Sequence, residues 1–287
     1  MTTRRDFLQT IAGGLGVAAL GAPRHAAAAG RPPIGLQLYS LRHQLQKDVP
    51  GTLAKVKAMG FEDVETAGTY GMSVADFAAA LRQAGLRARA AHFPYEQFRD
   101  DAAGVVRDAQ ALGASFMVCA WIPHQGAFSS EHVKGAAAVF GGAARAGKPQ
   151  GLRFAYHLHG YEFVAAPGGT LFDALVAQTA NDGVNFEVDV LWAKAGGADP
   201  GKLIEKLAGR VPLTHLKDMR KGTQYTPPVA SLPDDTNVVL GTGLLDFPAI
   251  LKASEKAGVE IHFLEDEHTE SIAQLPRSLA YLRTIAG

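Results

Sequence analysis

Eight short apolar segments separated by helix-like segments follow residue 30, and this alternation limits the fold more than any other feature. The segments have the length and composition of buried β-strands, at residues 33–40, 61–68, 86–93, 114–122, 152–159, 184–192, 211–218 and 261–267. Between them, apolar residues recur at three- and four-residue spacing in runs that end at glycine, as in residues 74–85 and 102–113. Strands that alternate with helices build a parallel sheet with helices on its faces. The chain is therefore predicted to be an α/β protein.

Eight strand–helix units within residues 30–287 match the number and size of a (β/α)8 TIM barrel that forms a single domain. A doubly wound open sheet is the main alternative, but no glycine-rich dinucleotide fingerprint follows the first strand. Two connections are longer than the rest, residues 123–131 after the fourth strand and residues 219–244 after the seventh. In a barrel both lie at the carboxyl ends of the strands, where active sites form.

Residues 1–29 have the pattern of an export signal rather than of a barrel element. Arg4 and Arg5 precede an apolar run at residues 10–22, and small residues follow that run. The arginine pair resembles a twin-arginine signal, which predicts the twin-arginine export machinery as a partner and a periplasmic or secreted location. The apolar run is too short for a stable membrane span. A frayed N-terminal helix is the alternative interpretation.

Charge and cysteine content exclude several classes of partner. The chain has a formal net charge of +0, so nothing in its composition favours nucleic acid or an anionic membrane surface. Its single cysteine, Cys119, lies in an apolar run and is expected to be a small buried core residue. With one cysteine, no disulfide can form within the chain.

Ionisable residues lie near the carboxyl end of almost every expected strand. They are Glu65, His92, His157, His159, Glu162, Glu187, Asp189, His215, Lys217, Asp218, Glu265 and Glu267. Residues i and i+2 of a strand face the same side, so His157 and His159 share a face, as do His215 and Lys217. One histidine or one ion pair at a strand end is more often structural, but burying all these charges among helices would be costly. Imidazole and carboxylate groups from four strands suit a divalent metal such as Mn2+, Zn2+, Co2+ or Mg2+.

Four stretches of this chain resemble the xylose-isomerase-like TIM-barrel superfamily, and in particular its sugar phosphate isomerase/epimerase branch. They are GLQLYSLR at 35–42, YHLHGYEF at 156–163, FEVDVLWAKAGGADP at 186–200 and THLKD at 214–218. The resemblance covers nearly all of the chain after the export signal, and it implies one divalent metal held by side chains of the fifth to eighth strands. Carried over by position, the ligands are Asp189, His215 and Glu265, with His157 where the related epimerases have glutamate.

The sequence departs from these relatives at three positions. In the epimerases, two metal-bound carboxylates act as acid and base on opposite faces of the substrate. His157 stands in place of one of them, so the same two-carboxylate mechanism is not expected here. Thr242 stands where the family's Gly-Glu-Gly stretch has glutamate. Trp192 stands where the related apurinic endonucleases have a zinc-binding histidine, which argues against a role in DNA repair.

The resemblance implies a metal-dependent isomerase or epimerase that acts on a free sugar, or on a related polyol or keto-sugar, through an enediolate intermediate. The implied base is Glu265, with Lys217 and Glu162 as alternatives. The side chains expected to contact substrate are His159, Trp192, Tyr39, His92 and Glu65. An exported location favours an unphosphorylated carbohydrate. A lyase that cleaves 3-keto-glycosides by β-elimination and a non-catalytic sugar-binding barrel stay open, as does a homo-oligomer.

Overall fold

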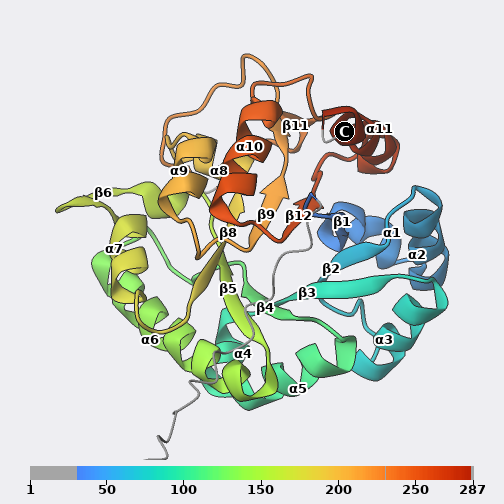
Figure 1. Ribbon diagram of the computed structural model, residues 1–287, viewed down its shortest axis with the longest axis horizontal. Helices are drawn as coiled ribbons and strands as arrows, with labels where there is room; N and C mark the ends of the chain where they lie inside the picture. The colour runs from blue at the N-terminus through green and yellow to red at the C-terminus, as the bar shows by residue number, and fades with distance from the viewer. Residues whose placement is uncertain (1–30, 230, 286–287) are drawn as a thin grey trace, which may run out of the picture. The chain divides into compact units, whose positions relative to one another are not determined.

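Eight parallel strands close into a barrel, as the alternation of segments predicts (Figure 1). The computed structural model describes residues 31–229 and 231–285, and the eight strands belong to one domain within them. The strands are β1 (Ile34–Gln37), β2 (Asp63–Ala67), β3 (Arg87–Phe93), β4 (Phe116–Cys119), β5 (Arg153–His157), β8 (Asn185–Asp189), β9 (Leu213–Leu216) and β12 (Ile261–Leu264). Each strand pairs with its neighbours in chain order, and β12 closes the ring against β1. The predicted TIM barrel is confirmed.

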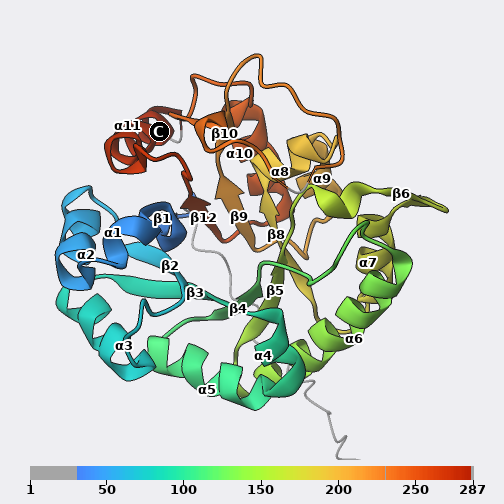
Figure 2. The same cartoon turned by 180° about the vertical axis from the view of Figure 1, so that it is seen from behind.

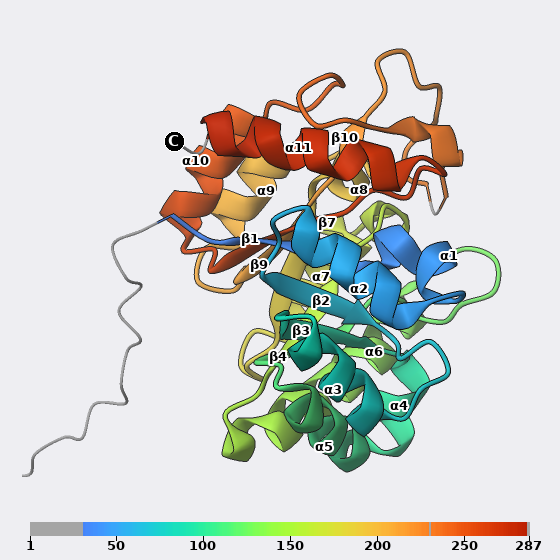
Figure 3. The ribbon, with the colours of Figure 1, turned by 90° about the vertical axis from the view of Figure 1, so that its right-hand side faces the viewer.

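Helices cover the outside of the barrel, and two opposite views show them as a ring around the strands (Figures 1 and 2). The longer ones are α2 (Val49–Ala58), α3 (Val74–Gln83), α5 (Ala102–Leu112), α6 (Ser130–Gly147), α7 (Leu171–Gln178), α9 (Pro200–Lys206), α10 (Phe247–Ala257) and α11 (Ser271–Ile285). Seen from the side, α2, α3 and α5 follow one another along the barrel wall (Figure 3). Leu53, Phe77 and Val105 lie on their buried faces, so the apolar periodicity of the sequence marks the faces that pack inward.

Shorter elements complete the described part of the chain. The short helices are α1 (Arg42–Leu45), α4 (Tyr95–Asp100), α8 (Val190–Ala195), η1 (Leu38–Leu41), η2 (Lys148–Gln150), η3 (Tyr161–Phe163) and η4 (Asp234–Thr236). Two antiparallel pairs lie outside the barrel sheet, β6 (Ala165–Ala166) with β7 (Gly169–Thr170) and β10 (Asp218–Met219) with β11 (Asn237–Val238).

The predicted export signal at residues 1–29 lies outside the described residues. The signal, the export machinery as a partner and the periplasmic or secreted location therefore stay predictions. Within residues 31–229 and 231–285, no helix combines the length and the apolar character needed to cross a bilayer.

The barrel interior holds two layers of different chemistry. Alternate residues of each strand point inward, and the layer nearer the amino ends is apolar: Ala90, Phe116, Val118, Ala155, Leu213, Ile261 and Phe263. A Cβ at Gly35 on β1 would lie 2.8 Å from the Phe263 ring, so this position needs glycine. Two residues further along their strands, Ala155 is followed by His157 and Leu213 by His215, both buried. The apolar layer thus supports a polar layer nearer the carboxyl ends.

The sixth strand of the barrel is shorter than the sequence predicts. We expected a strand over residues 184–192, but β8 ends at Asp189 and a helix follows at once. Asp189 Oδ1 accepts hydrogen bonds from the backbone N–H groups of Leu191 and Trp192, both at 2.9 Å. The carboxylate therefore caps α8, and the apolar residues after it are buried as a helix instead of a strand. Its other oxygen, Oδ2, faces the polar layer of the barrel.

One carboxylate ties the long connection after β9 to the barrel. Asp218 accepts hydrogen bonds of 2.8–3.1 Å from four backbone N–H groups within residues 219–245. The pairing of β10 with β11 closes the base of the same connection. The connection is thereby held near the carboxyl ends of the strands, where Leu232 and Asp234 line a cavity.

Candidate active site

A cavity of about 880 Å3 opens at the carboxyl ends of the barrel strands. Its innermost lining comes from the polar layer, and we call these residues the cavity floor: Gln37, His92, His157, Lys217 and Glu265. Its sides come from the connections that follow the strands. This is the face of a TIM barrel on which active sites are built.

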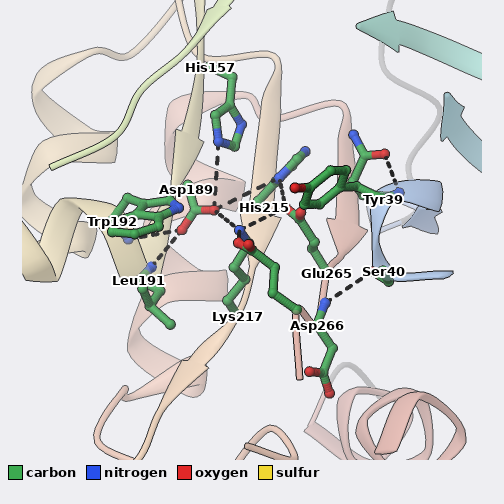
Figure 4. Close-up of polar contacts among 12 residues, drawn as sticks. Tyr39, Ser40, His157, Asp189, Leu191, Trp192, His215, Lys217, Glu265 and Asp266 are labelled. Carbon is green, nitrogen blue, oxygen red and sulfur yellow. Dashed lines mark hydrogen bonds and ion pairs between the residues drawn. The ribbon is translucent and has the colours of Figure 1, made fainter. Parts of the chain in front are cut away.

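Three of the predicted metal ligands come together next to the cavity floor: Glu265 belongs to the floor, and the fully buried Asp189 and His215 lie beside it (Figure 4). Asp189 on β8 lies in register with His215 on β9, and Glu265 directly follows the neighbouring strand β12. One ligand atom from each of the three side chains lies within 4.8 Å of the other two. All three side chains are buried. Two carboxylates and one imidazole from separate strands form the kind of donor set that divalent metals use.

The fourth predicted ligand, His157, approaches the same place from β5. Its Nε2 lies 3.8 Å from Asp189 Oδ2, and His215 Nδ1 lies 3.9 Å from the same oxygen. Asp189 Oδ2 accepts no hydrogen bond from the described residues, and its nearest cation is the Lys217 ammonium group at 3.1 Å. Two imidazole nitrogens and one carboxylate oxygen thus face a common point.

Two buried glutamates lie beneath the histidines and orient their rings. Glu187 Oε2 lies 3.1 Å from His157 Nδ1 and 3.2 Å from His92 Nε2. Glu65 Oε2 lies 2.6 Å from His215 Nε2. Because a carboxylate only accepts hydrogen bonds, the ring nitrogens that face it carry the protons. The arrangement matches the carboxylate–histidine pairs that set the orientation of metal-bound histidines.

Burial and neighbouring charges together set the pKa values of these histidines. Burial, together with the positive charge of His215, lowers the pKa of His157 to about 3, so the His157 ring is neutral. Its proton lies on Nδ1, which leaves the lone pair of Nε2 directed at Asp189. Burial also opposes charge on His215, but carboxylates led by Glu187 hold the pKa of His215 well above its usual value. Burial also opposes charge on His92, but Glu65 and Glu187 raise the pKa of His92 to about 9.

Lys217 supplies the strong positive charge of the cavity floor. Its Nζ lies 2.6 Å from Glu267 Oε1, 2.9 Å from Glu265 Oε2 and 3.1 Å from Asp189 Oδ2. Burial opposes the charge, but the three carboxylates raise the pKa of Lys217 well above its usual value. Three carboxylates around one ammonium group leave an excess of negative charge at this point.

The residues present fit a bound divalent cation. The excess negative charge, the Asp189 oxygen without a hydrogen bond and the lone pair of His157 all meet at one place. A mixed set of imidazole nitrogens and carboxylate oxygens suits Mn2+, Co2+ or Zn2+ better than Mg2+, which prefers oxygen ligands. His215 Nδ1 lies 2.6 Å from Glu265 Oε2 as a hydrogen bond, so a cation would take the place of the shared proton.

Four of the residues expected to contact substrate line the cavity: His159, Trp192, Tyr39 and His92. Tyr39 and Trp192 flank the ligand group in Figure 4. His159 packs between two rings: its ring centre lies 4.9 Å from that of His157, which it meets edge-on, and 5.3 Å from that of Trp192, to which it is tilted. These side chains are therefore placed to contact a molecule bound above the cavity floor.

Four predicted site residues do not line the cavity: Asp189 and His215 belong to the buried ligand group described above, and Glu65 and Glu162 are carboxylates with other partners. Glu65 is fully buried beneath the cavity floor, where it contacts His215. Glu162 is also fully buried, and its Oε1 accepts hydrogen bonds from the Tyr156 hydroxyl and from the backbone N–H of His159 at 2.8 Å. Burial raises the pKa of Glu162 to about 7. The structure places both carboxylates as supports for residues of the cavity.

Three residues of this region escaped the sequence analysis as site residues. Side-chain parity places Glu187 on the same strand face as Asp189, but it does not tell that Glu187 lies in contact with His157 and His92. Gln37 at the end of β1 donates a hydrogen bond to Glu65 at 2.7 Å, but an uncharged side chain gives no signal in a search for ionisable groups. Trp121 lines the cavity and is 40% exposed, although its apolar surroundings in the sequence suggest a core residue.

An eight-stranded parallel barrel with clustered imidazole and carboxylate groups at the carboxyl ends of its strands defines a class: TIM-barrel proteins with a candidate cation site. The chain belongs to the xylose isomerase-like TIM barrel family, whose family model matches residues 53–285. The family resemblance predicted from the four sequence stretches is confirmed.

Solved structures with the same fold include sugar phosphate isomerase/epimerases. One from Parabacteroides distasonis ATCC 8503 is 26% identical with a TM-score of 0.71, covering 90% of this chain and 95% of its own. A second from the same organism is 25% identical with a TM-score of 0.72, covering 88% and 98%. The IOLI protein, solved with a binding zinc atom, is 14% identical with a TM-score of 0.68 and shares the fold over 88% and 98% of the two chains. Comparison with curated proteins gave no match.

Proposed function

We propose that this protein is a divalent-metal-dependent isomerase or epimerase that acts on a free sugar or on a related polyol or keto-sugar. The observation that carries the proposal is the convergence of Asp189, His215 and Glu265 from three neighbouring strands next to the floor of a large cavity, which Glu265 lines. A cation held there, with His157 as a fourth ligand, would polarise a carbonyl and an adjacent hydroxyl oxygen of the sugar. Membership of a family whose solved neighbours include sugar phosphate isomerase/epimerases supports the same class of chemistry.

The chain's own side chains supply the remaining parts of this reaction. Glu265 is the carboxylate of the ligand group that also lines the cavity, so we propose that it removes the proton next to the carbonyl to give the enediolate. Lys217 lines the cavity beside it as an ammonium group and would donate hydrogen bonds to the oxygen that becomes negative. Glu162 has no part in this proposal, because its carboxylate is buried under His159 and does not reach the cavity.

The test measures metal content and turnover in the same preparations. Asp189→Asn keeps the oxygen that caps α8 while removing a charged ligand, and His215→Gln removes the imidazole. Both variants are expected to lose the bound cation and the turnover of ketoses, inososes or 3-keto-glucosides in the presence of Mn2+. His262→Gln is the matched control, because His262 is a buried histidine that contacts Thr214 and not the ligand group.

The outcomes separate the competing functions. Release of the aglycone from a 3-keto-glucoside without isomerisation of free sugars would replace the isomerase with the β-eliminating lyase. A purified wild-type chain that takes up no divalent cation but still binds sugar would support the non-catalytic barrel and contradict the proposal. Incorporation of solvent deuterium next to the carbonyl of a ketose, lost in Asp189→Asn, would support it.

A further inference from the structure

We infer that the cavity takes an uncharged keto-sugar whose ring carries an aromatic substituent, and does not take a phosphorylated sugar. The inference rests on the proposed function, because it places the sugar ring at the ligand group of the cavity floor. Three properties of the cavity carry it: its charge, its aromatic wall and its size.

Away from the cavity floor, the described residues that line the cavity include no lysine or arginine to hold a phosphate group. Protein phosphate sites use arginine or lysine side chains and helix N-termini. Among the described residues that line this cavity, Lys217 is the only lysine and there is no arginine. Lys217 is already surrounded by three carboxylates at 2.6–3.1 Å, and Glu96 and Asp234 add further negative charge to the lining.

The position of these acids strengthens the argument. In TIM barrels the phosphate site is commonly built from the connections after the seventh and eighth strands. In this barrel those strands are β9 and β12, and the connections after them bring Asp234 and Glu267 to the cavity. A phosphate group at the usual place would therefore meet carboxylates, so the cavity favours an uncharged ligand.

One side of the cavity is aromatic, and we call Phe93, Tyr95 and Trp121 the aromatic wall. Phe93 on β3 lies in register with Cys119 on the adjacent strand β4, and two residues further along each chain segment come Tyr95, the first residue of α4, and Trp121. Trp121 is 40% exposed, and in the described chain it is one of three large apolar side chains with such exposure. Exposed aromatic surface inside a cavity is typical of ligand binding, because it is stabilised when an apolar ligand covers it.

The Trp121 ring is held in place before any ligand binds. Its centre lies 5.2 Å from that of His124, with the rings stacked at 20°. Tyr161 and His159 contact it edge-on at 4.6 and 5.4 Å. An indole fixed by three neighbouring rings loses little conformational freedom on binding, so it serves as a preformed platform.

The cavity has room for a ligand of two parts, a sugar ring and an aromatic substituent. Pockets that hold drug-sized molecules measure about 300–1,000 Å3, and this cavity of about 880 Å3 lies near the upper end. A single sugar ring is much smaller than such a molecule. The His159 ring lies 4.9 Å from His157 on one side and 5.4 Å from Trp121 on the other, so the aromatic wall begins one side chain away from the ligand group. A substituent on a sugar bound at the cavity floor would reach Trp121.

The experiment compares three probes by titration calorimetry with the full-length chain in the presence of Mn2+: phenyl glucoside, methyl glucoside and glucose 6-phosphate. The wild type is expected to bind phenyl glucoside about tenfold more tightly than methyl glucoside, as expected for one aromatic contact plus its buried area. Glucose 6-phosphate is expected to bind more weakly than methyl glucoside. Trp121→Ala is expected to abolish most of the phenyl preference, whereas Trp121→Phe keeps a ring and retains it.

Leu244→Ala is the matched control, because Leu244 is 45% exposed and does not line the cavity, so its removal should leave all three affinities unchanged. Equal affinity for phenyl and methyl glucosides in the wild type, or tighter binding of glucose 6-phosphate, would overturn the inference and leave the proposed function intact. A chain that binds Mn2+ but none of the probes also overturns the inference alone. A chain that binds neither Mn2+ nor any probe overturns the proposed function and the inference together.

Discussion

Replacing Glu187 by glutamine tests whether the buried glutamates beneath the histidines orient the His157 ring for metal binding. Glu187 is fully buried, and one of its oxygens lies 3.1 Å from His157 Nδ1 and 3.2 Å from His92 Nε2. Glutamine keeps the volume of the side chain and one accepting oxygen, but it removes the negative charge. Its amide oxygen can take the place of Oε2, but as a neutral acceptor it holds the His157 Nδ1–H group more weakly, so the preferred orientation of His157 is weakened.

The expected size of the effect follows from these two contacts. Hydrogen bonds to a charged partner contribute about 1.5–3 kcal/mol, against about 0.5–1.5 kcal/mol for neutral partners. The loss of charge at these two hydrogen bonds therefore weakens the arrangement by about 2–3 kcal/mol, and the loss of the ion pair between Glu187 Oε2 and His215 Nε2, 3.1 Å apart, adds to it. If that arrangement is what prepares His157 as a ligand, the affinity for Mn2+ or Zn2+ should fall about 10–100-fold, the range found for such supporting residues.

The assay is a competition titration of the metal-free chain with Mn2+ or Zn2+ against a chelating dye, with thermal unfolding to verify the fold of each variant. Glu162→Gln is the matched control, because Glu162 is an equally buried glutamate that contacts Tyr156 and the His159 backbone instead of a predicted ligand side chain. Its metal affinity should stay within about threefold of the wild type, as for substitutions without a shared partner. Wild-type affinity in Glu187→Gln, or an equal loss in both variants, would refute the reasoning.

Two further predictions concern stability. Burial lowers the pKa of His262 from 6.5 to about 4. Between these pH values the unfolded chain binds a proton at this histidine and the folded chain does not. The contribution of His262 to the free energy of unfolding should therefore fall by about 3 kcal/mol as the pH drops from 7 to 4. Chemical denaturation should show a loss in His262→Gln that is smaller than in the wild type by about this amount, because other buried histidines such as His157 contribute equally to both chains; equal pH profiles would contradict the reasoning. Gly35→Ala should lower the free energy of unfolding by about 1–3 kcal/mol, because its Cβ would lie 2.8 Å from the Phe263 ring and 2.9 Å from the Asp63 carbonyl oxygen. Gly142→Ala in α6, where a Cβ has open space, should be neutral or stabilising, and an equal loss in both glycine variants would count against the packing argument.

The barrel itself could be predicted because its signals are local. Each strand is an apolar run and most helices show their periodicity within about a dozen residues, so fold class needs no knowledge of distant contacts. The exceptions have physical reasons. The helix α6 contains glycines at 135, 141 and 142, which weaken the helical pattern, yet it is stabilised by burial of Val133 and Phe140. The sixth strand ends early because a side-chain cap at Asp189 outweighs the strand preference of the residues after it.

The candidate site could be predicted in part. Asp189, His215 and Glu265 lie on three strands that are adjacent in the ring, and the parity of a strand tells which side chains share a face. Parity does not tell how deep a side chain lies. Glu65 and Glu162 are the same residue type as Glu265, but they are buried under other residues while Glu265 reaches the cavity.

The sequence by itself determined the alternation of strands and helices, the family, and the set of ionisable groups at the strand ends. Only the tertiary structure decided which of these groups share a cavity, which carboxylates orient the histidines from below, and that Trp121 is exposed. The physical reason is that secondary structure depends on neighbours along the chain. The depth of a side chain and the identity of its partners depend on the register between strands, which is set when the whole ring closes and packs.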